Sequence, residues 1–140
     1  MTEAGTAALV AGIGFRKEAA AAEIEALIRQ ALAGIGAEPR ALRMIATALD
    51  RSRDPALCEA AAAFALSPTG FDPSALAACD DRAPTRSERI LTLRGVGSLS
   101  ETAALAGAGR DGRLAGPRIA SGSVTCALAF CAKSRDGDRP

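Results

Sequence analysis

The sequence predicts an α/β fold: a three-layer sandwich around a mixed sheet of about five strands that ends in an antiparallel hairpin. Short apolar runs alternate with amphipathic stretches in the first half of the chain, which favours parallel strands joined by helices. Near the C-terminus two apolar arms flank Ser121-Gly122, a pattern typical of a hairpin. The 140 residues suffice for one domain, which we expect over residues 1–132, followed by a polar, flexible tail over 133–140.

The first half is predicted to hold two strands and two helices. Residues 7–13 form a short apolar run ended by glycine, which is typical of a buried strand. Over residues 18–35 apolar positions recur at three- and four-residue spacing, which predicts an amphipathic helix. Residues 42–49 are the second strand candidate. Asp54-Pro55 is an N-cap followed by proline, and it predicts a helix that continues to about residue 64.

The middle of the chain is predicted to be irregular. Ser67–Gly70 ends the second helix, and residues 64–66 are the candidate for a short third strand. Asp72-Pro73 repeats the cap-and-proline pattern before a short helix over 74–79. Residues 80–89 are a polar loop, and 90–93 are either a brief strand or a helical turn.

The last third is predicted to contain one helix and the hairpin. Ser98 and Glu101 form a capping box before a helix that ends near Gly107, and a glycine turn follows. The hairpin arms are expected over 113–120 and 124–132, the second of which is apolar enough for a central strand.

Absent residue types exclude several classes of function. The chain has no histidine, which rules out a Ser-His-Asp triad, a Cys-His dyad and a mixed Cys/His zinc site. It has no tryptophan or tyrosine, and its net charge is +1, so neither base stacking nor electrostatic attraction favours nucleic acid. No metal and no cofactor are expected.

The cysteines and the apolar runs indicate a cytoplasmic protein. The four cysteines form no C-x-x-C pair, so we expect reduced, mostly buried thiols, with Cys126 and Cys131 on opposite faces of a strand. No apolar run approaches the roughly 20 residues that span a bilayer. Residues 1–8 lack the features of a signal peptide, and no membrane partner is expected.

Charge is unevenly distributed along the chain. Residues 1–81 carry 7 basic and 11 acidic side chains, whereas residues 82–118 carry 7 arginines and 3 acids. A solvated basic surface that balances the acidic half would explain this excess. Alternatively, the arginines bind a small polyanionic ligand, because the planar guanidinium matches carboxylate or phosphate.

The stretch L-V-A-G-I-G-F-R-K-E-A at residues 9–19 resembles part of a dinucleotide fingerprint. That fingerprint needs G-x-G-x-x-G, and Gly12 and Gly14 supply two glycines. Asp50, after the second strand candidate, could act as the ribose-binding acid. Lys17 occupies the third glycine position, and its long side chain argues against a dinucleotide.

A more general anion site is the alternative. The phosphate-loop pattern G-x-x-x-x-G-K-[ST] is not met, because Arg16 precedes Lys17 and Glu18 follows it. The start of the next helix, together with Arg16 and Lys17, favours negative charge. A tight strand-to-helix turn with two solvated cations explains the same residues.

Hydroxyl and carboxyl groups give weaker signals. Ser121–Thr125 is a hydroxyl-rich turn beside Arg118, although hairpin turns often use Ser and Gly for conformation alone. Ser98 is better explained as a cap than as a nucleophile, because no base is evident. Thr85 and Ser87 lie among arginines and either join an anion site or decorate a loop. The acid–base candidates, whose separation the sequence does not set, are Asp50, Asp80 and Asp81.

Taken in order, four motifs resemble the family of CobE and the C-terminal domain of CbiG, from cobalamin biosynthesis. The motifs are V-A-G-I-G-F-R at 10–16, a serine loop at 85–88, G-V-G-S-L-S-E-T-A-A-L at 95–105 and P-R-I-A-S-G-S-V-T-C-A-L-A at 117–129. Together they cover about residues 7–132. The resemblance implies a compact α/β domain that acts in construction of the corrin ring.

The resemblance also implies a ligand, a precorrin or corrinoid, which is a macrocycle edged with acetates and propionates. Arginine suits such a rim because it can bind a carboxylate through two hydrogen bonds. The expected contacts, most of them in the first and last motifs, are Gly12, Gly14, Arg16, Ser87, Arg118, Ser121 and Thr125. Other enzymes of the pathway are further candidate partners.

Three functions therefore stay open, and with them whether the chain is an enzyme. The first is a protein that binds a precorrin or corrinoid through its carboxylate rim. The second is a hydrolase of a precorrin ring-A lactone or acyl fragment. The resemblance implies this function, because full-length CbiG opens that lactone with release of acetaldehyde. The third is a nucleotide-binding module. No catalytic residue is predicted.

Overall fold

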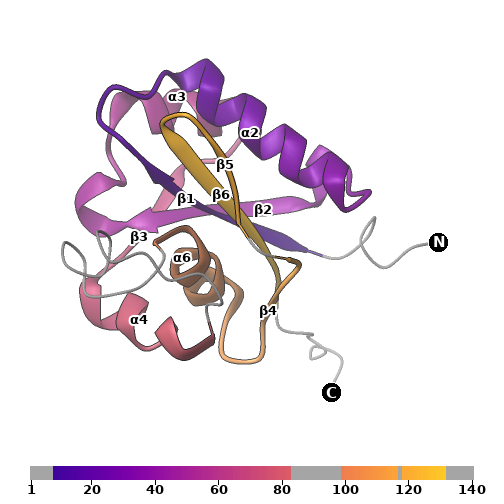
Figure 1. Ribbon diagram of the computed structural model, residues 1–140, viewed down its shortest axis with the longest axis vertical. Helices are drawn as coiled ribbons and strands as arrows, with labels where there is room; N and C mark the ends of the chain where they lie inside the picture. Colours follow the sequence, from indigo (N-terminus) through magenta and orange to yellow (C-terminus); the bar gives the residue numbers. More distant parts are fainter. Residues whose placement is uncertain (1–7, 83–98, 117, 132–140) are drawn as a thin grey trace.

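The computed structural model describes residues 8–82, 99–116 and 118–131. These residues form a six-stranded mixed sheet in the order β3-β2-β1-β6-β4, with β5 also paired to β6 (Figure 1). Strands β1, β2 and β3 are parallel, and β6 is antiparallel to β1, β4 and β5. The strands are β1 Leu9–Phe15, β2 Leu42–Ala48, β3 Pro68–Phe71, β4 Arg113–Leu114, β5 Ile119–Ser121 and β6 Val124–Phe130.

Helices cover both faces of this sheet (Figure 1). One face, here the α2 face, packs against α2 (Ala21–Gly34) and α3 (Pro55–Ala62); the other, the α6 face, packs against α4 (Pro73–Ala77) and α6 (Leu99–Ala108). Three 3₁₀ turns complete the described elements: η1 Pro39–Ala41, η2 Leu49–Arg51 and η3 Asp80–Arg82. The predicted fold class, a three-layer α/β sandwich with a mixed sheet and a terminal hairpin, is confirmed.

Alternation along β1 divides the core into two parts. Leu9, Ala11, Ile13 and Phe15 join the cluster under α2 and α3, whereas Val10 joins the cluster under α6. This follows from the two-residue period of a strand, which sends successive side chains to opposite faces. Each face is therefore sealed by its own apolar layer.

The two predicted helix caps are confirmed. The Asp54 carboxylate accepts a hydrogen bond from the Ala56 amide at 2.9 Å, and α3 begins at Pro55. Asp72 likewise accepts from the Ala75 amide at 2.9 Å, and α4 begins at Pro73. These hydrogen bonds satisfy amides that have no partner within the helix.

The third strand is Pro68–Phe71, so its prediction at residues 64–66 was wrong. Those residues instead close α3: Ala65 has φ 62°, and the Leu66 amide donates to the Ala61 carbonyl at 3.0 Å. This left-handed closure is a common helix end. Proline is tolerated at the first position of an edge strand, where its missing N–H breaks no ladder bond.

The first arm of the predicted hairpin is divided into β4 and β5, which pair with different ends of β6. The predicted strand at 7–13 is observed as Leu9–Phe15. Predictions for the loop after residue 82, residues 90–93, Ser98 and the tail at 133–140 lie outside the described residues.

Candidate functional site

The three parallel strands end together at one edge of the sheet, here called the carboxyl edge. Their last residues are Phe15, Ala48 and Phe71. Strand β6 begins at the same edge, because Val124 pairs with Phe15. Ligands of such sheets tend to bind outside the carboxyl ends of the strands, so this edge is the candidate site.

Arg16 is the first residue beyond β1 and is exposed. Its amide donates to the Ser123 carbonyl at 2.9 Å, which fixes the backbone beside the β5–β6 turn. Within the described residues the Arg16 side chain forms no ion pair. The guanidinium is therefore available to an anion from solution.

Gly12 and Gly14 lie inside β1, not in the turn that follows it. Both are buried and pair with Ala127 and Thr125 of β6. A Cβ on Gly12 would overlap the Ser100 carbonyl of α6. We expected these glycines to let a ligand approach, but close packing of α6 explains Gly12 instead. Because both glycines lie inside a strand, they form no phosphate-binding loop.

Thr125 lies beside Gly14 on the α6 face. Its hydroxyl donates to the Gly14 carbonyl at 3.4 Å, a long hydrogen bond. A Cβ on Gly14 would lie 2.8 Å from the same hydroxyl oxygen. Glycine at this position thus leaves room for Thr125.

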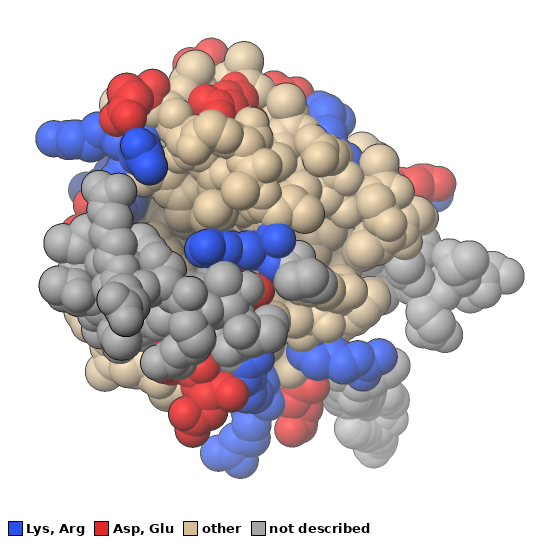
Figure 2. Space-filling view, viewed as in Figure 1, with Lys and Arg blue, Asp and Glu red and all other residues tan. Residues whose placement is uncertain are grey.

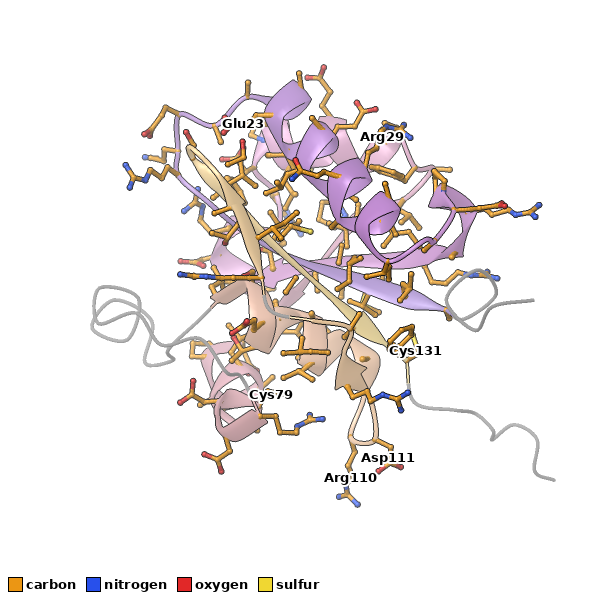
Figure 3. The ribbon with its side chains drawn as sticks, turned by 45° about the vertical axis from the view of Figure 1, so that its right-hand side comes forward. Glu23, Arg29, Cys79, Arg110, Asp111 and Cys131 are labelled. Carbon is orange, nitrogen blue, oxygen red and sulfur yellow. The ribbon has the colours of Figure 1, made fainter. Side chains whose placement is uncertain are left out.

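Glu23, near the start of α2, closes the β5–β6 turn, which the sequence patterns did not indicate. Its Oε2 accepts from the Ser123 amide at 3.0 Å and from the Ser121 hydroxyl at 3.3 Å. Figure 3 shows Glu23 at the end of α2 next to this hairpin. Ser121 was expected to contact a ligand; in the structure its hydroxyl stabilises the turn, and a ligand carboxylate there would face the Glu23 carboxylate.

Arg118 lies against the first turn of α6. Its amide donates to Oε2 of Glu101 at 3.1 Å, and Glu101 is fully buried. The Arg118 residue is half-buried. The sequence indicated Glu101 only as part of a capping box, whereas the structure joins it to the segment that carries Arg118.

The arginines between residues 82 and 118 are not brought together. Arg82 donates to the carbonyls of Arg110 (3.2 Å) and Gly112 (2.9 Å), so it stabilises the turn after α6. Figure 3 shows Arg110 at the tip of that turn, far from Glu23. Figure 2 shows the basic side chains of this face in several separate places rather than in one patch. Ser87, Arg86, Arg89 and Arg94 lie outside the described residues.

The thiols are free and face different surroundings. Cys126 packs in the core of the α2 face, where burial raises the pKa of its thiol to about 12. Cys131 packs against the α6 face, as predicted, and burial raises its pKa although Arg43 opposes this. Cys79 is buried, but Cys58 is exposed, contrary to expectation. Within the described ranges no three Cys, Asp or Glu residues form a group that could hold a metal ion.

Comparison with known proteins decides the family. The family described as the cobalamin synthesis G C-terminus matches residues 9–129. The chain belongs to this family. It is 38% identical over 128 residues to Protein CobE from a Sinorhizobium species, covering 91% of this chain and 82% of that protein. The resemblance predicted from the sequence is thus confirmed, and the chain is a protein of cobalamin biosynthesis.

Solved structures of cobalamin-biosynthesis proteins share the fold. CobE, a protein from the cobalamin (vitamin B12) biosynthetic pathway, gives a TM-score of 0.83 at 27% identity over 93% of this chain and 94% of that one. Cobalamin biosynthesis protein chiG from Agrobacterium tumefaciens gives a TM-score of 0.70 at 38% identity over 89% of this chain and 98% of that one. A cobalamin biosynthesis protein G homologue from Sulfolobus solfataricus is 20% identical and gives a TM-score of 0.65 over 89% of this chain but 37% of its own length. Of the helices in the described segments, none is both long and apolar enough to cross a membrane.

Proposed function

We propose that the chain binds a precorrin or corrinoid intermediate at the carboxyl edge, through carboxylates on the rim of the ligand. Membership in a cobalamin-biosynthesis family supports the ligand class. The observation that carries the proposal is that Arg16 at this edge and Arg118 beside the middle of β6 have no ion-pair partner in the described parts of the chain. Arg29 and Arg40, by contrast, are each paired with a glutamate at 2.9 Å.

The two arginines would bind different carboxylates. The Arg16 amide pairs with Ser123, whereas Arg118 precedes Ile119, which is opposite Cys126. The position opposite Arg118 lies four residues after Ser123 in the chain, which is about 13 Å at the rise of a strand. Acetate and propionate arms spaced around a macrocycle match such a separation.

The expected energetics follow from charge-assisted hydrogen bonds. Such a bond contributes about 1.5–3 kcal/mol, and partial exposure reduces this through solvent screening. Loss of one guanidinium should therefore weaken binding by about tenfold, which corresponds to 1.4 kcal/mol. Added salt should weaken binding in the wild-type chain because part of the attraction is screened.

The test is a titration of the purified chain with hydrogenobyrinic acid, followed by visible absorbance. Arg16→Ala and Arg118→Ala should each raise the dissociation constant, and their effects should add, because sites this far apart are independent. Arg40→Ala is the matched control: Arg40 is exposed, pairs with Glu38 and lies before β2, at the opposite edge. Unchanged affinity in both site variants would refute the proposal.

One contact favours the hydrolase alternative. The Ser121 hydroxyl donates to Glu23 at 3.3 Å, which places a hydroxyl next to a carboxylate base. The same carboxylate oxygen also accepts the Ser123 amide, so its first role is to close the turn. Release of acetaldehyde or acetate from a lactone-bearing precorrin, abolished by Ser121→Ala, would support hydrolysis; binding without release would support the binding function.

A further inference from the structure

Arginine side chains cover phenylalanine rings at separate places in the described structure. The distances from guanidinium carbon to ring centroid are 4.2 Å for Arg51 over Phe15, 4.7 Å for Arg29 over Phe64 and 5.4 Å for Arg113 over Phe130. Arg29 also pairs with Glu25, and Arg113 is exposed to water. Arg51 differs from both, because it is half-buried and its Nη2 is buried without a hydrogen-bond partner.

The stacked pair lies at the candidate site. Phe15 is the last residue of β1, and Arg51 ends η2, which follows directly after β2. Because β1 and β2 are neighbouring parallel strands, both residues lie at the carboxyl edge. Arg16 follows Phe15 in the chain, so the Arg51 guanidinium adds a second cation to the same edge.

The contact with the ring does not satisfy the hydrogen-bond donors of the guanidinium. The N–H groups of arginine lie in the guanidinium plane and point outward from its central carbon. A buried donor with no partner is unfavourable, and the nearby Asp54 carboxylate already caps α3 through the Ala56 amide. A planar, two-oxygen acceptor such as a carboxylate matches the planar donor fork of arginine.

We propose that Arg51 is a carboxylate-binding residue of the carboxyl edge, held in orientation by Phe15. Because Nη2 is buried, a ligand group that pairs with it must reach below the protein surface. This favours a carboxylate on a short flexible arm. Acetate and propionate arms have this form. The assignment of these arms to a corrin ring rests on the proposed function, whereas the carboxylate site itself rests on the stack and the unpartnered nitrogen.

The first experiment compares variants of the full chain in the hydrogenobyrinic acid titration. Arg51→Met keeps an apolar cover on Phe15 and should weaken binding about tenfold; Arg51→Lys keeps the charge but loses the planar fork and should bind with intermediate affinity. Arg29→Met removes a similar stack from α2, away from the edge, and should bind like the wild type. Thermal unfolding of each variant, followed by circular dichroism, separates lost stability from lost binding. Wild-type affinity in both Arg51 variants would overturn the inference.

A second probe separates this inference from the proposed function. Tricarballylate, an acyclic tricarboxylate, is titrated while the Arg51 Nε–H signal, assigned by its loss in Arg51→Lys, is followed by NMR. If hydrogenobyrinic acid does not bind but tricarballylate shifts this signal, the corrin assignment fails and the carboxylate site stands. If neither probe shifts it, the carboxylate site is rejected.

Discussion

Replacing Gly12 by alanine tests whether this glycine serves helix packing. The new Cβ would overlap the Ser100 carbonyl and lie 2.5 Å from the Ala104 nitrogen, both backbone atoms of α6. An unstrained contact needs about 3.5 Å, so α6 must shift by at least about 1 Å. That helix packs tightly on β1, and Ala103 and Ala104 are fully buried. Overpacking of this kind costs about 1–3 kcal/mol, and we expect the upper end because no flexible side chain can yield.

The assay is urea and thermal unfolding followed by far-ultraviolet circular dichroism, since the chain has no tryptophan or tyrosine. A loss of about 3 kcal/mol should lower Tm by about 10 °C in a domain of this size. Gly34→Ala is the matched control: Gly34 ends α2, and no atom lies within 4 Å of its added Cβ. It should be neutral or stabilise by up to about 1 kcal/mol. Equal stability of the two variants would refute the packing explanation.

Three further predictions concern other described residues. Glu23→Ala should destabilise the fold by about 1–3 kcal/mol in urea unfolding, because the β5–β6 turn loses two charge-assisted hydrogen bonds; a wild-type midpoint would contradict this. The pKa of Asp72 is lowered chiefly by the Ala75 amide. The ionised Asp72 carboxylate should therefore stabilise the fold above about pH 4, and this stabilisation should disappear as pH falls through the lower pKa of the folded state. Asp72→Asn should flatten this acid dependence of the unfolding midpoint. Iodoacetamide at pH 8 should modify exposed Cys58 but spare Cys126, whose thiol has a pKa of about 12; mass spectrometry of the native chain showing modified Cys126 would count against its burial.

Features set by neighbouring residues were predictable from the sequence. Asp54-Pro55 and Asp72-Pro73 start helices because an acceptor and a fixed φ act within one turn. Strand β3 was misplaced because residues 64–66 are used to close α3, and pairing with β2 selects the proline-containing segment that follows. Which residues form β3 therefore depends on pairing with β2, and local composition does not reveal that pairing.

The same contrast explains what was missed at the site. Gly12 and Gly14 had the spacing of a ligand loop, yet the tight approach of α6, more than eighty residues later in the chain, accounts for Gly12. Glu23 was visible only as an acid near a helix start, whereas its partners lie about a hundred residues away. No sequence motif includes Arg51, because its distinguishing feature is the contact with the ring of Phe15 at the end of β1.

Arg113 and Arg118 show why a cluster in sequence need not be a cluster in space. Arg113 pairs with Phe130 at one end of β6, whereas Arg118 precedes Ile119, which pairs with Cys126 toward the other end. The positions opposite Arg113 and Arg118 are three residues apart along β6, which is about 10 Å, so these arginines are separated along the sheet. Arg16 and Arg51, 35 positions apart in sequence, are instead brought to one edge because β1 and β2 are parallel neighbours. Parallel pairing, rather than local arginine density, therefore determines which cations can share a ligand in this fold.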